Sequence, residues 1–179
     1  MPSRERCIAD ITLKSRGVET RLGSSVECRV SSVTVCALLT LLLQSRGLWT
    51  LPAGFMELGE SAAEGAVRET WEEACARVRA VAPFAHFDVP AIGQAYVLFR
   101  AELAEEGFAA GAESLDVRMV ALEEMDEYQL AFSSIRVALR EYVADADAGR
   151  FRVHSGVIAK KALDPSDPNG FDFLDHVAL

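Results

Sequence analysis

The chain has 179 residues, half of them hydrophobic, with a formal net charge of −9 and a pI of about 4.9. This length and apolar content suffice for one domain with a substantial core. The acidic balance argues against broad binding to nucleic acid or to an anionic membrane. Four cysteines without a pairing pattern indicate a reducing compartment without structural disulfides.

The N-terminal third carries few motif signals. Residues 1–32 are expected to form a divergent or disordered extension, followed by one domain over residues 33–160 and a tail over residues 161–179. Cys7, Cys28 and Cys36 lie too far apart for a C-x-x-C knuckle, so no zinc is expected. Residues 33–43, VTVCALLTLLL, predict one buried strand, or two strands without a hairpin, and are too short to span a bilayer.

A helix is predicted to begin near Ser61, because Ser61 and Glu64 have capping-box spacing. It follows a short apolar run that Pro52 and Gly54 end, so strand, glycine loop and helix come in order. One mostly apolar stripe would face the core, and Trp71 belongs to it. Its members are Ala63, Ala66, Val67, Thr70, Trp71 and Ala74.

Three carboxylates, Glu69, Glu72 and Glu73, are expected on the opposite face of this helix. Like charges three or four residues apart cost a helix a few tenths of a kcal/mol per pair, roughly. A cation over the cluster would offset that cost, and hard carboxylate oxygens suit Mg²⁺ or Mn²⁺. The alternative is a solvated acidic face with Arg68 paired to Glu72.

The rest of the chain predicts an α/β sandwich. Two strands are expected first, one broken at Pro83 and the next with both faces covered. A loop, a third strand and a helix capped by Ser133 or Ser134 follow. The expected elements are strands 77–88, 93–103 and 117–122, the loop 107–113 and the helix from 133 or 134.

The segment from Gly54 to Ala76 has the pattern G-x5-E-x7-R-E-x-x-E-E, which resembles the signature of the Nudix hydrolases. The chain from Ser45 onward is similar to one subgroup, the plant and bacterial flavin adenine dinucleotide (FAD) pyrophosphatases. The segments that carry this likeness are GLWTLPAGFME, AAEGAVRETWEEACARV, IGQAYVLFRAEL, ESLDVRMVALEEM, LAFSSIRVALREY and FRVHSGVIAKK. The resemblance implies an α/β/α sandwich with a mixed sheet and a catalytic strand–loop–helix.

The resemblance also implies the chemistry: water and Mg²⁺ or Mn²⁺ cleave the diphosphate of a nucleotide compound, here FAD to FMN and AMP. The positions that match the family's metal ligands are Glu69, Glu72, Glu73 and the carbonyl of Gly54. Arg68 would orient Glu72 or Glu73. Either Glu69 or an acid on a later loop, Glu113 or Asp116, would activate the water.

Three further residues are candidates for substrate contact. Glu60 lies at the mouth of the helix, where it would support the loop or an outer metal ion. Phe87 and Tyr96 are candidates to stack on an adenine or isoalloxazine ring, although core packing is the more common fate of such residues. His86 and His154 are isolated in the sequence, and no metal is expected at either.

Two departures from the family pattern stand out. Cys75 occupies a position that is usually glycine, and Ala76 one that is usually aliphatic; altered packing at the helix end is expected. The hairpin that relatives place before the motif is not evident, which leaves a truncated, poorly folded product as one alternative. Others are an ADP-ribose or NADH pyrophosphatase and a binding module without turnover. Family members often dimerise, and the compartment stays open between cytoplasm and plastid stroma.

Overall fold

The computed structural model describes residues 4–10, 12–14, 35–43, 47–161 and 170–179. Its helices and strands follow one another as β1 Arg4–Asp10, β2 Thr12–Lys14, β3 Val35–Leu42, β4 Trp49–Thr50, β5 Ala53–Phe55, α1 Ala62–Ala74, β6 Val78–Val89, η2 Pro90–Ile92, β7 Gln94–Leu103, β8 Ser114–Ala121, η3 Leu122–Glu127, α2 Ser133–Asp147, β9 His154–Lys160 and β10 Phe171–Ala178. Within these residues no helix is both long and apolar enough to cross a membrane.

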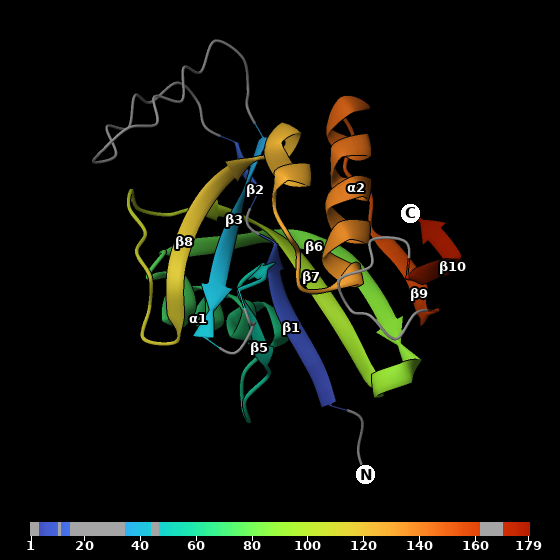
Figure 1. Cartoon of the computed structure of the whole chain (residues 1–179), viewed down its shortest axis with the longest axis horizontal. Coiled ribbons are helices and arrows are strands. Elements are labelled where there is room, and N and C mark those ends of the chain that lie inside the picture. The colour runs from blue at the N-terminus through green and yellow to red at the C-terminus, as the bar shows by residue number, and fades with distance from the viewer. Residues whose placement is uncertain (1–3, 11, 15–34, 44–46, 162–169) are drawn as a thin grey trace.

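The strands form two sheets (Figure 1). The larger has the order β10-β9-β6-β7-β1-β5, and the smaller has β2-β3-β4 with β8 also paired to β3. The pairs β1–β7 and β6–β9 are parallel and the other pairs antiparallel, so the larger sheet is mixed. The expected mixed sheet is confirmed.

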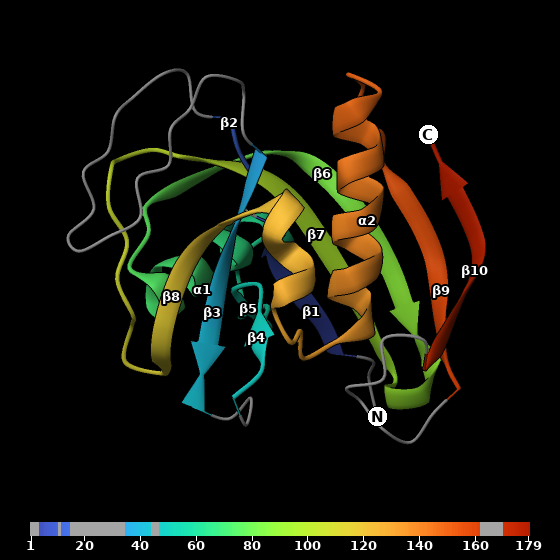
Figure 2. The same ribbon diagram turned by 45° about the horizontal axis from the view of Figure 1, so that its top comes forward.

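Helices cover the central strands from both sides (Figures 1 and 2). On strand β7, Tyr96 and Leu98 belong to a core shared with α2, whereas Phe99 and Ala101 belong to a second core shared with α1. Successive residues of a strand point to opposite faces, so β7 contributes to both cores. This confirms the α/β/α sandwich and the prediction that both faces of this strand are covered.

Strand β3 explains the uninterrupted apolar run near residue 40. Ala37 and Leu39 pack in the α2 core and Leu38 in the α1 core, all three fully buried. A strand buried on both faces has no polar side to alternate with, which is why the sequence lacks an amphipathic pattern. The prediction of a single strand is confirmed, and no hairpin turn interrupts it.

Strands β1 and β2 lie within residues 1–32, and β10 lies within residues 161–179. Strand β1 pairs with both β7 and β5, and β10 pairs with β9 at the far edge of the same sheet. The terminal segments therefore contribute strands, while the division into extension, domain and tail stays a prediction.

Three local details refine the sequence analysis. Strand β6 shifts register on either side of Pro83, in agreement with the expected break. Helix α2 begins at Ser133, but Phe132 occupies the N-cap position and makes no side-chain cap bond. Trp71 is 45% exposed beneath the Arg77 guanidinium, so its assignment to the core was wrong. The buried face of α1 centres on Ala66, Thr70 and Ala74, and one residue beyond Thr70 turns away by about 100°.

Candidate active site

The start of helix α1 is fixed by its own sequence. The Ser61 hydroxyl accepts from the Glu64 amide at 3.3 Å, and the Glu64 carboxylate accepts from the Ser61 amide at 2.8 Å. This reciprocal capping box satisfies two backbone donors that the first turn leaves unpaired. The predicted N-terminus is confirmed, and it sets the direction in which every later side chain of the helix points.

Arg68 ties the loop before the helix to the helix itself. Its Nε and Nη2 atoms donate to the two carboxylate oxygens of Glu60 at 3.1 and 2.8 Å, and Nη2 also donates to the Phe55 carbonyl at 3.1 Å. The hydrogen bonds from Arg68 hold the pKa of Glu60 below its usual range. Glu60 also accepts from the Glu57 amide at 2.7 Å. Glu60 thus supports the loop, and its contact with substrate stays a prediction.

The remaining nitrogen of Arg68 orients two of the three motif carboxylates. Nη1 donates to Glu69 at 2.8 Å and to Glu72 at 3.1 Å. Charge-assisted bonds from one planar guanidinium fix the positions of both acids relative to the loop. Of the two partners expected for Arg68, the structure therefore brings Glu72 to it, whereas Glu73 has other partners.

Glu73 is buried, only 4% exposed, beside strands β3 and β5. Its carboxylate accepts from the Thr40 hydroxyl at 3.1 Å and from the backbone of Ala53. It lies three residues after Thr70 and seven after Ala66, and so shares the buried face of the helix. The expectation that all three carboxylates stand opposite that face was wrong for Glu73.

Burial and like charge raise the pKa values of two carboxyls. Burial raises the pKa of Glu73 to about 8, with the nearby charges of Glu69 and Glu113 adding to the effect. Burial also raises the pKa of Glu69 against the opposing influence of Arg68. A buried carboxyl with such a shift gains most from a cation that neutralises its charge.

Gly54 lies directly against Glu69. A Cβ atom at this position would be 1.8 Å from Oε1 of Glu69. Strand β5 and helix α1 can therefore bring the Gly54 backbone and the Glu69 carboxylate together only because the residue has no side chain. The Gly54 backbone and the Glu69 carboxylate are therefore in contact, and the Gly54 carbonyl as a metal ligand stays a prediction.

The loop before β8 closes the other side of the site. Its Ala109 and Gly111 amides donate to the carbonyls of Ala74 and Glu73, each at 2.9 Å, and thereby bond the last turn of α1. Glu113 follows in this loop, exposed, and its charge acts on Glu69 and Glu73.

Asp116, the other loop acid considered, points elsewhere. Its carboxylate accepts from the Val117 amide at 2.9 Å and from Arg118 at 3.0 Å. The effect of the Glu113 charge on Glu69 and Glu73 thus favours Glu113 over Asp116 as the loop acid that acts with the motif carboxylates.

Sequence reasoning missed two residues of this site. Thr40 is a polar residue within an apolar run, and that contrast was its only signal. Gly111 approaches the helix so closely that a Cβ atom would lie 1.8 Å from the Glu72 carbonyl oxygen. Nothing in the sequence spacing indicates that contact, because it depends on how the loop folds back.

Phe87 and Tyr96 do not face the site. Both rings are buried in the α2 core, at 0% and 2% exposure, and Phe87 packs edge-on against Phe173. The Tyr96 hydroxyl donates to Gln94 at 3.0 Å. Neither ring surface is available to a nucleotide in this structure, so the burial supports the core interpretation given as the alternative.

The donor set suits a hard divalent cation. Glu69, Glu72, Glu73 and the Gly54 carbonyl supply only oxygen, which Mg²⁺ and Mn²⁺ prefer over nitrogen or sulfur. The raised pKa of Glu73 marks a buried acid whose ionisation lacks a cationic partner among the residues it contacts. The residues therefore fit the metal that the motif implies.

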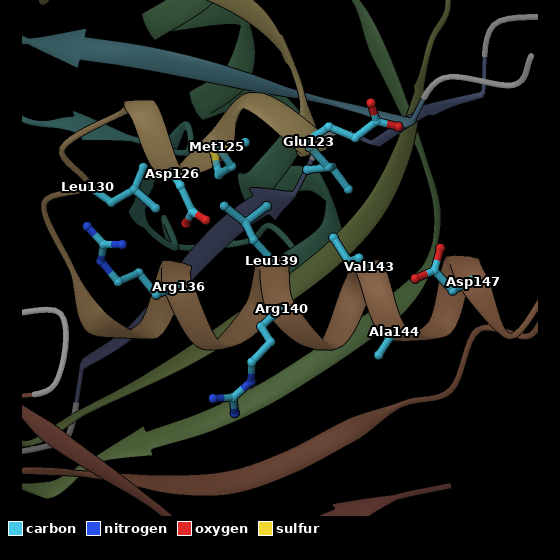
Figure 3. A pocket seen from close by; sticks show the side chains of 11 residues that line it. Glu123, Met125, Asp126, Leu130, Arg136, Leu139, Arg140, Val143, Ala144 and Asp147 are labelled. Carbon is cyan, nitrogen blue, oxygen red and sulfur yellow. The ribbon is translucent and has the colours of Figure 1, made fainter.

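A surface hollow between η3 and α2 is separate from this site (Figure 3). Leu139 and Val143 of α2 line it together with Met125 and Leu130, and charged side chains such as Arg136 stand at its rim. None of the motif residues lines this hollow, so we assign it no role in the chemistry of the motif site.

Comparison with known proteins agrees with the geometry. The NUDIX domain model matches residues 33–141. A crystal structure of a Nudix hydrolase from Nitrosomonas europaea is 33% identical, with 89% of this chain and 81% of that chain covered and a TM-score of 0.72. No curated protein matches the chain.

More distant structures share the fold. An ADP-ribose pyrophosphatase from Streptococcus suis is 18% identical, covering 79% of this chain and 92% of that one, with a TM-score of 0.56. An Ap4A hydrolase from C. elegans is 16% identical, covering 81% and 98%, with a TM-score of 0.59. Together with the motif geometry, the matched family model establishes that the chain belongs to the NUDIX domain family and is a Nudix hydrolase.

Proposed function

We propose that this protein hydrolyses the diphosphate bond of a dinucleotide-type substrate with Mg²⁺ or Mn²⁺, and that FAD, cut to FMN and AMP, is the first substrate to test. The observation that carries the proposal is the arrangement of the motif acids: Arg68 bonds Glu69 and Glu72, the charge of Glu69 acts on the buried Glu73, and the Gly54 backbone lies against Glu69. Such a set of oxygens on rigid elements suits metal-assisted phosphoryl chemistry better than a solvated acidic face.

The metal would be held by Glu69, Glu72 and Glu73 with the Gly54 carbonyl. When bound, it supplies charge neutralisation for the diphosphate and a Lewis acid for the attacking and leaving oxygens. Arg68 fixes the carboxylates of Glu69 and Glu72 relative to the loop before the helix, and Thr40 positions Glu73. These contacts preorganise the acids before substrate arrives.

In the reaction, water oxygen bonds to phosphorus, the bridging P–O bond breaks, and the water proton passes to a carboxylate. Glu69 and Glu113 are the two candidates for that acceptor. Glu69 lies within the Arg68 network, whereas Glu113 is exposed on the loop and free to approach a bound substrate. A general base needs hydrogen-bond reach to the water, so activity of the Glu113→Gln and Glu69→Gln variants against pH separates them.

Two observations bear on the substrate. Likeness to the FAD pyrophosphatase subgroup extends outside the motif, over segments such as IGQAYVLFRAEL, and favours FAD. Distant fold neighbours include an ADP-ribose pyrophosphatase and an NrtR NUDIX domain from Shewanella oneidensis complexed with ADP ribose, which keeps ADP-ribose as the runner-up. NADH contains the same diphosphate and adenosine and is the third candidate substrate.

The test is product analysis. The protein is incubated with FAD, ADP-ribose or NADH in Mg²⁺ or Mn²⁺, and the products are resolved by chromatography. FMN and AMP from FAD, at a higher kcat/KM than the other two compounds give, support the proposal. A higher kcat/KM with ADP-ribose or NADH would identify that compound, and not FAD, as the preferred substrate. No product from any of them, with a cooperative melt, contradicts catalysis and leaves a binding module. Size-exclusion chromatography of the same sample shows whether the chain dimerises, as members of the family often do.

A further inference from the structure

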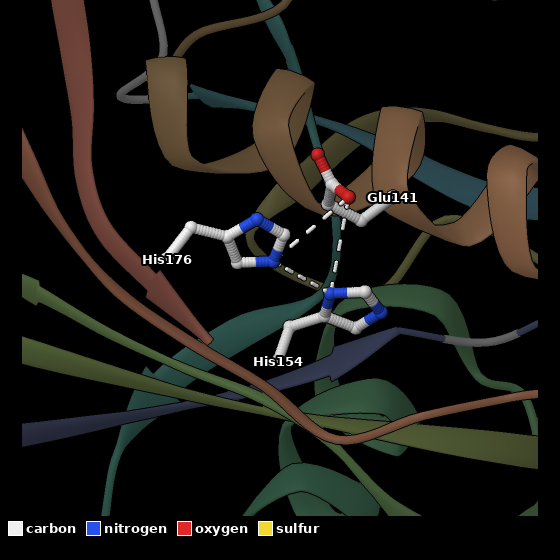
Figure 4. A group of neighbouring side chains, drawn as sticks. All are labelled: Glu141, His154 and His176. Carbon is white, nitrogen blue, oxygen red and sulfur yellow. Dashed lines mark hydrogen bonds and ion pairs between the residues drawn. The ribbon is translucent and has the colours of Figure 1, made fainter. Parts of the chain in front are cut away.

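A second group of potential ligand atoms lies on the opposite side of the sandwich from the motif helix (Figure 4). Glu141 comes from α2, His154 begins β9, and His176 lies in β10. Nδ1 of His154 and Nε2 of His176 are 3.0 Å apart, and Glu141 Oε2 is 3.8 and 3.9 Å from them. Among the described residues this is the one group whose ligand atoms all lie within 4.8 Å of one another.

An irregularity in β10 brings His176 into this group. Between Leu174 and Val177 the strand advances three residues while β9 advances two, which is a β-bulge. Phe173 and His176 would face opposite sides of a regular strand, yet their rings are 4.7 Å apart. Asp175, inside the bulge, has φ of 51°, a conformation that a residue other than glycine rarely adopts. The bulge, with its unusual backbone at Asp175, therefore directs the His176 side chain toward His154.

His154 is held in one orientation by a buried acid. Its Nε2 atom is 2.9 Å from Asp145 Oδ2, and both side chains are fully buried. Asp145 also accepts from the Arg152 amide at 2.7 Å and from its guanidinium. Burial alone would raise the pKa of Asp145, but these bonds from His154 and Arg152 outweigh it and lower that pKa. With Nε2 directed at the Asp145 carboxylate, Nδ1 of His154 is the ring nitrogen that faces His176.

Glu141 is oriented in a similar way. Arg140 donates from Nε and Nη2 to Glu141 Oε1 at 3.2 and 3.0 Å, and Oε2 is left toward the two imidazoles. Glu141 and Asp145 are four residues apart, so they share one face of α2. One helix therefore supplies both an acid that meets the histidine pair and an acid that orients His154.

We propose that Glu141, His154 and His176 bind one divalent transition-metal ion, with Zn²⁺ the best match. Two imidazoles and one carboxylate form a known zinc donor set, completed by water at the fourth position. Zinc bonds of about 2.0–2.1 Å at tetrahedral angles separate ligand atoms by about 3.3 Å, a value that the three observed distances bracket. His176 is 31% exposed and gives the ion a route from solvent.

The Asp145–His154 contact is the carboxylate–histidine pair that commonly supports a metal-bound imidazole. This site differs from the sequence expectation, which treated His154 as isolated and expected no zinc. It also differs in chemistry from the all-oxygen motif site, so the two prefer different ions. The competing interpretation is a direct hydrogen bond between the two histidines without any metal.

Zinc titration with a matched set of variants tests the proposal. Wild type, His176→Ala and His86→Ala are titrated with Zn²⁺ by calorimetry under reducing conditions in excess Mg²⁺, which occupies the motif carboxylates. His86 is the remaining histidine and is 49% exposed beside Asp88, so it controls for surface binding. All three proteins keep the same cysteines, so these contribute equally.

The expected result is one more bound Zn²⁺ per chain in wild type and His86→Ala than in His176→Ala, with affinity in His176→Ala lower by at least about 100-fold. Co²⁺ in place of Zn²⁺ should give visible absorption of a four-coordinate site in wild type and lose it in His176→Ala. Equal stoichiometry in wild type and His176→Ala, or no Zn²⁺ bound by wild type at micromolar concentration, overturns the proposal. Because none of these readouts uses turnover, they are independent of the proposed hydrolysis.

Discussion

The motif site on α1 and the histidine group on α2, β9 and β10 are both built from carboxylates held by arginine, but they differ in what the carboxylates face. At the motif site, Arg68 holds Glu69 and Glu72, and the candidate metal ligands are all oxygen atoms. Burial there raises the pKa of Glu73 to about 8. In the histidine group, Arg152 helps to hold Asp145 ionised against an imidazole. The same arginine–acid pairing thus prepares one region for a hard cation and the other for a nitrogen-preferring one.

A glycine permits the close approach in each region, and the two glycines offer the sharpest way to separate them. Gly54→Ala would push a Cβ atom into the Glu69 carboxylate, which is the movable end of a side chain. The fold should survive while Glu69 is displaced, so kcat with FAD should fall at least about 100-fold with little change in Tm. Steady-state kinetics and thermal melts measure both. Unchanged kcat would remove the Gly54–Glu69 contact from the mechanism.

Gly156→Ala tests the other region. Its Cβ atom would lie 2.4 Å from the Phe173 ring. That ring packs against the His176 imidazole. A ring packed in a core moves at a cost, so we expect a loss of about 1–3 kcal/mol in the free energy of unfolding and weaker Zn²⁺ binding. Urea unfolding measures the first, with Ser155→Ala, the exposed neighbour, as control. Stability equal to that control would show that Phe173 is not fixed there.

The raised pKa of Glu73 predicts how pH acts on the motif site alone. Because its folded pKa exceeds the unfolded value of 4.5, the metal-free fold loses stability as pH rises from about 4.5 to about 8. Mg²⁺ binding must release this proton, so its Kd should tighten nearly tenfold from pH 6 to pH 7. Glu73→Gln should weaken this loss of stability, with the smaller contribution of Glu69 remaining. A Mg²⁺ affinity independent of pH in wild type contradicts the assignment.

The smallest expected effect is at the end of α1. Cys75 caps the helix with φ of 47°, where the family usually has glycine. A side chain in the left-handed region costs about 1–2 kcal/mol, so Cys75→Gly should raise stability by about 1 kcal/mol, or roughly 2–4 °C in Tm. Cys75→Ala keeps the strain and serves as control. An equal gain from both variants would point to the thiol instead of the backbone.

The start and course of the motif helix could be predicted from the sequence because its parts are local. Ser61, Arg68 and the three acids lie within one helix and its cap, so 3.6-residue spacing and capping chemistry place them directly. Burial of Glu73 escaped prediction because it depends on Thr40 and Ala53 of two other strands. Trp71 was misplaced for a similar reason: helical periodicity alone cannot tell which edge of an apolar stripe the sheet covers.

The histidine group could not be predicted in the same way. Glu141, His154 and His176 are separated by 13 and 22 residues, and their meeting depends on the pairing of β9 with β10. Regular strand alternation would also have placed His176 on the wrong side, because the bulge at Asp175 reverses it. Tertiary register, and not local pattern, creates that cluster.

Metal-dependent diphosphate hydrolysis at the motif site predicts different rates for the variants Glu72→Gln and Glu57→Gln, because Arg68 holds Glu72 among the motif acids. Glu57 is an exposed acid of the preceding loop whose side chain is outside the Arg68 network. With FAD and saturating Mg²⁺, product chromatography should give at least about a 100-fold loss of kcat in Glu72→Gln and wild-type rates in Glu57→Gln, with both folds intact. Equal rates in the two variants would contradict metal-dependent hydrolysis by these acids.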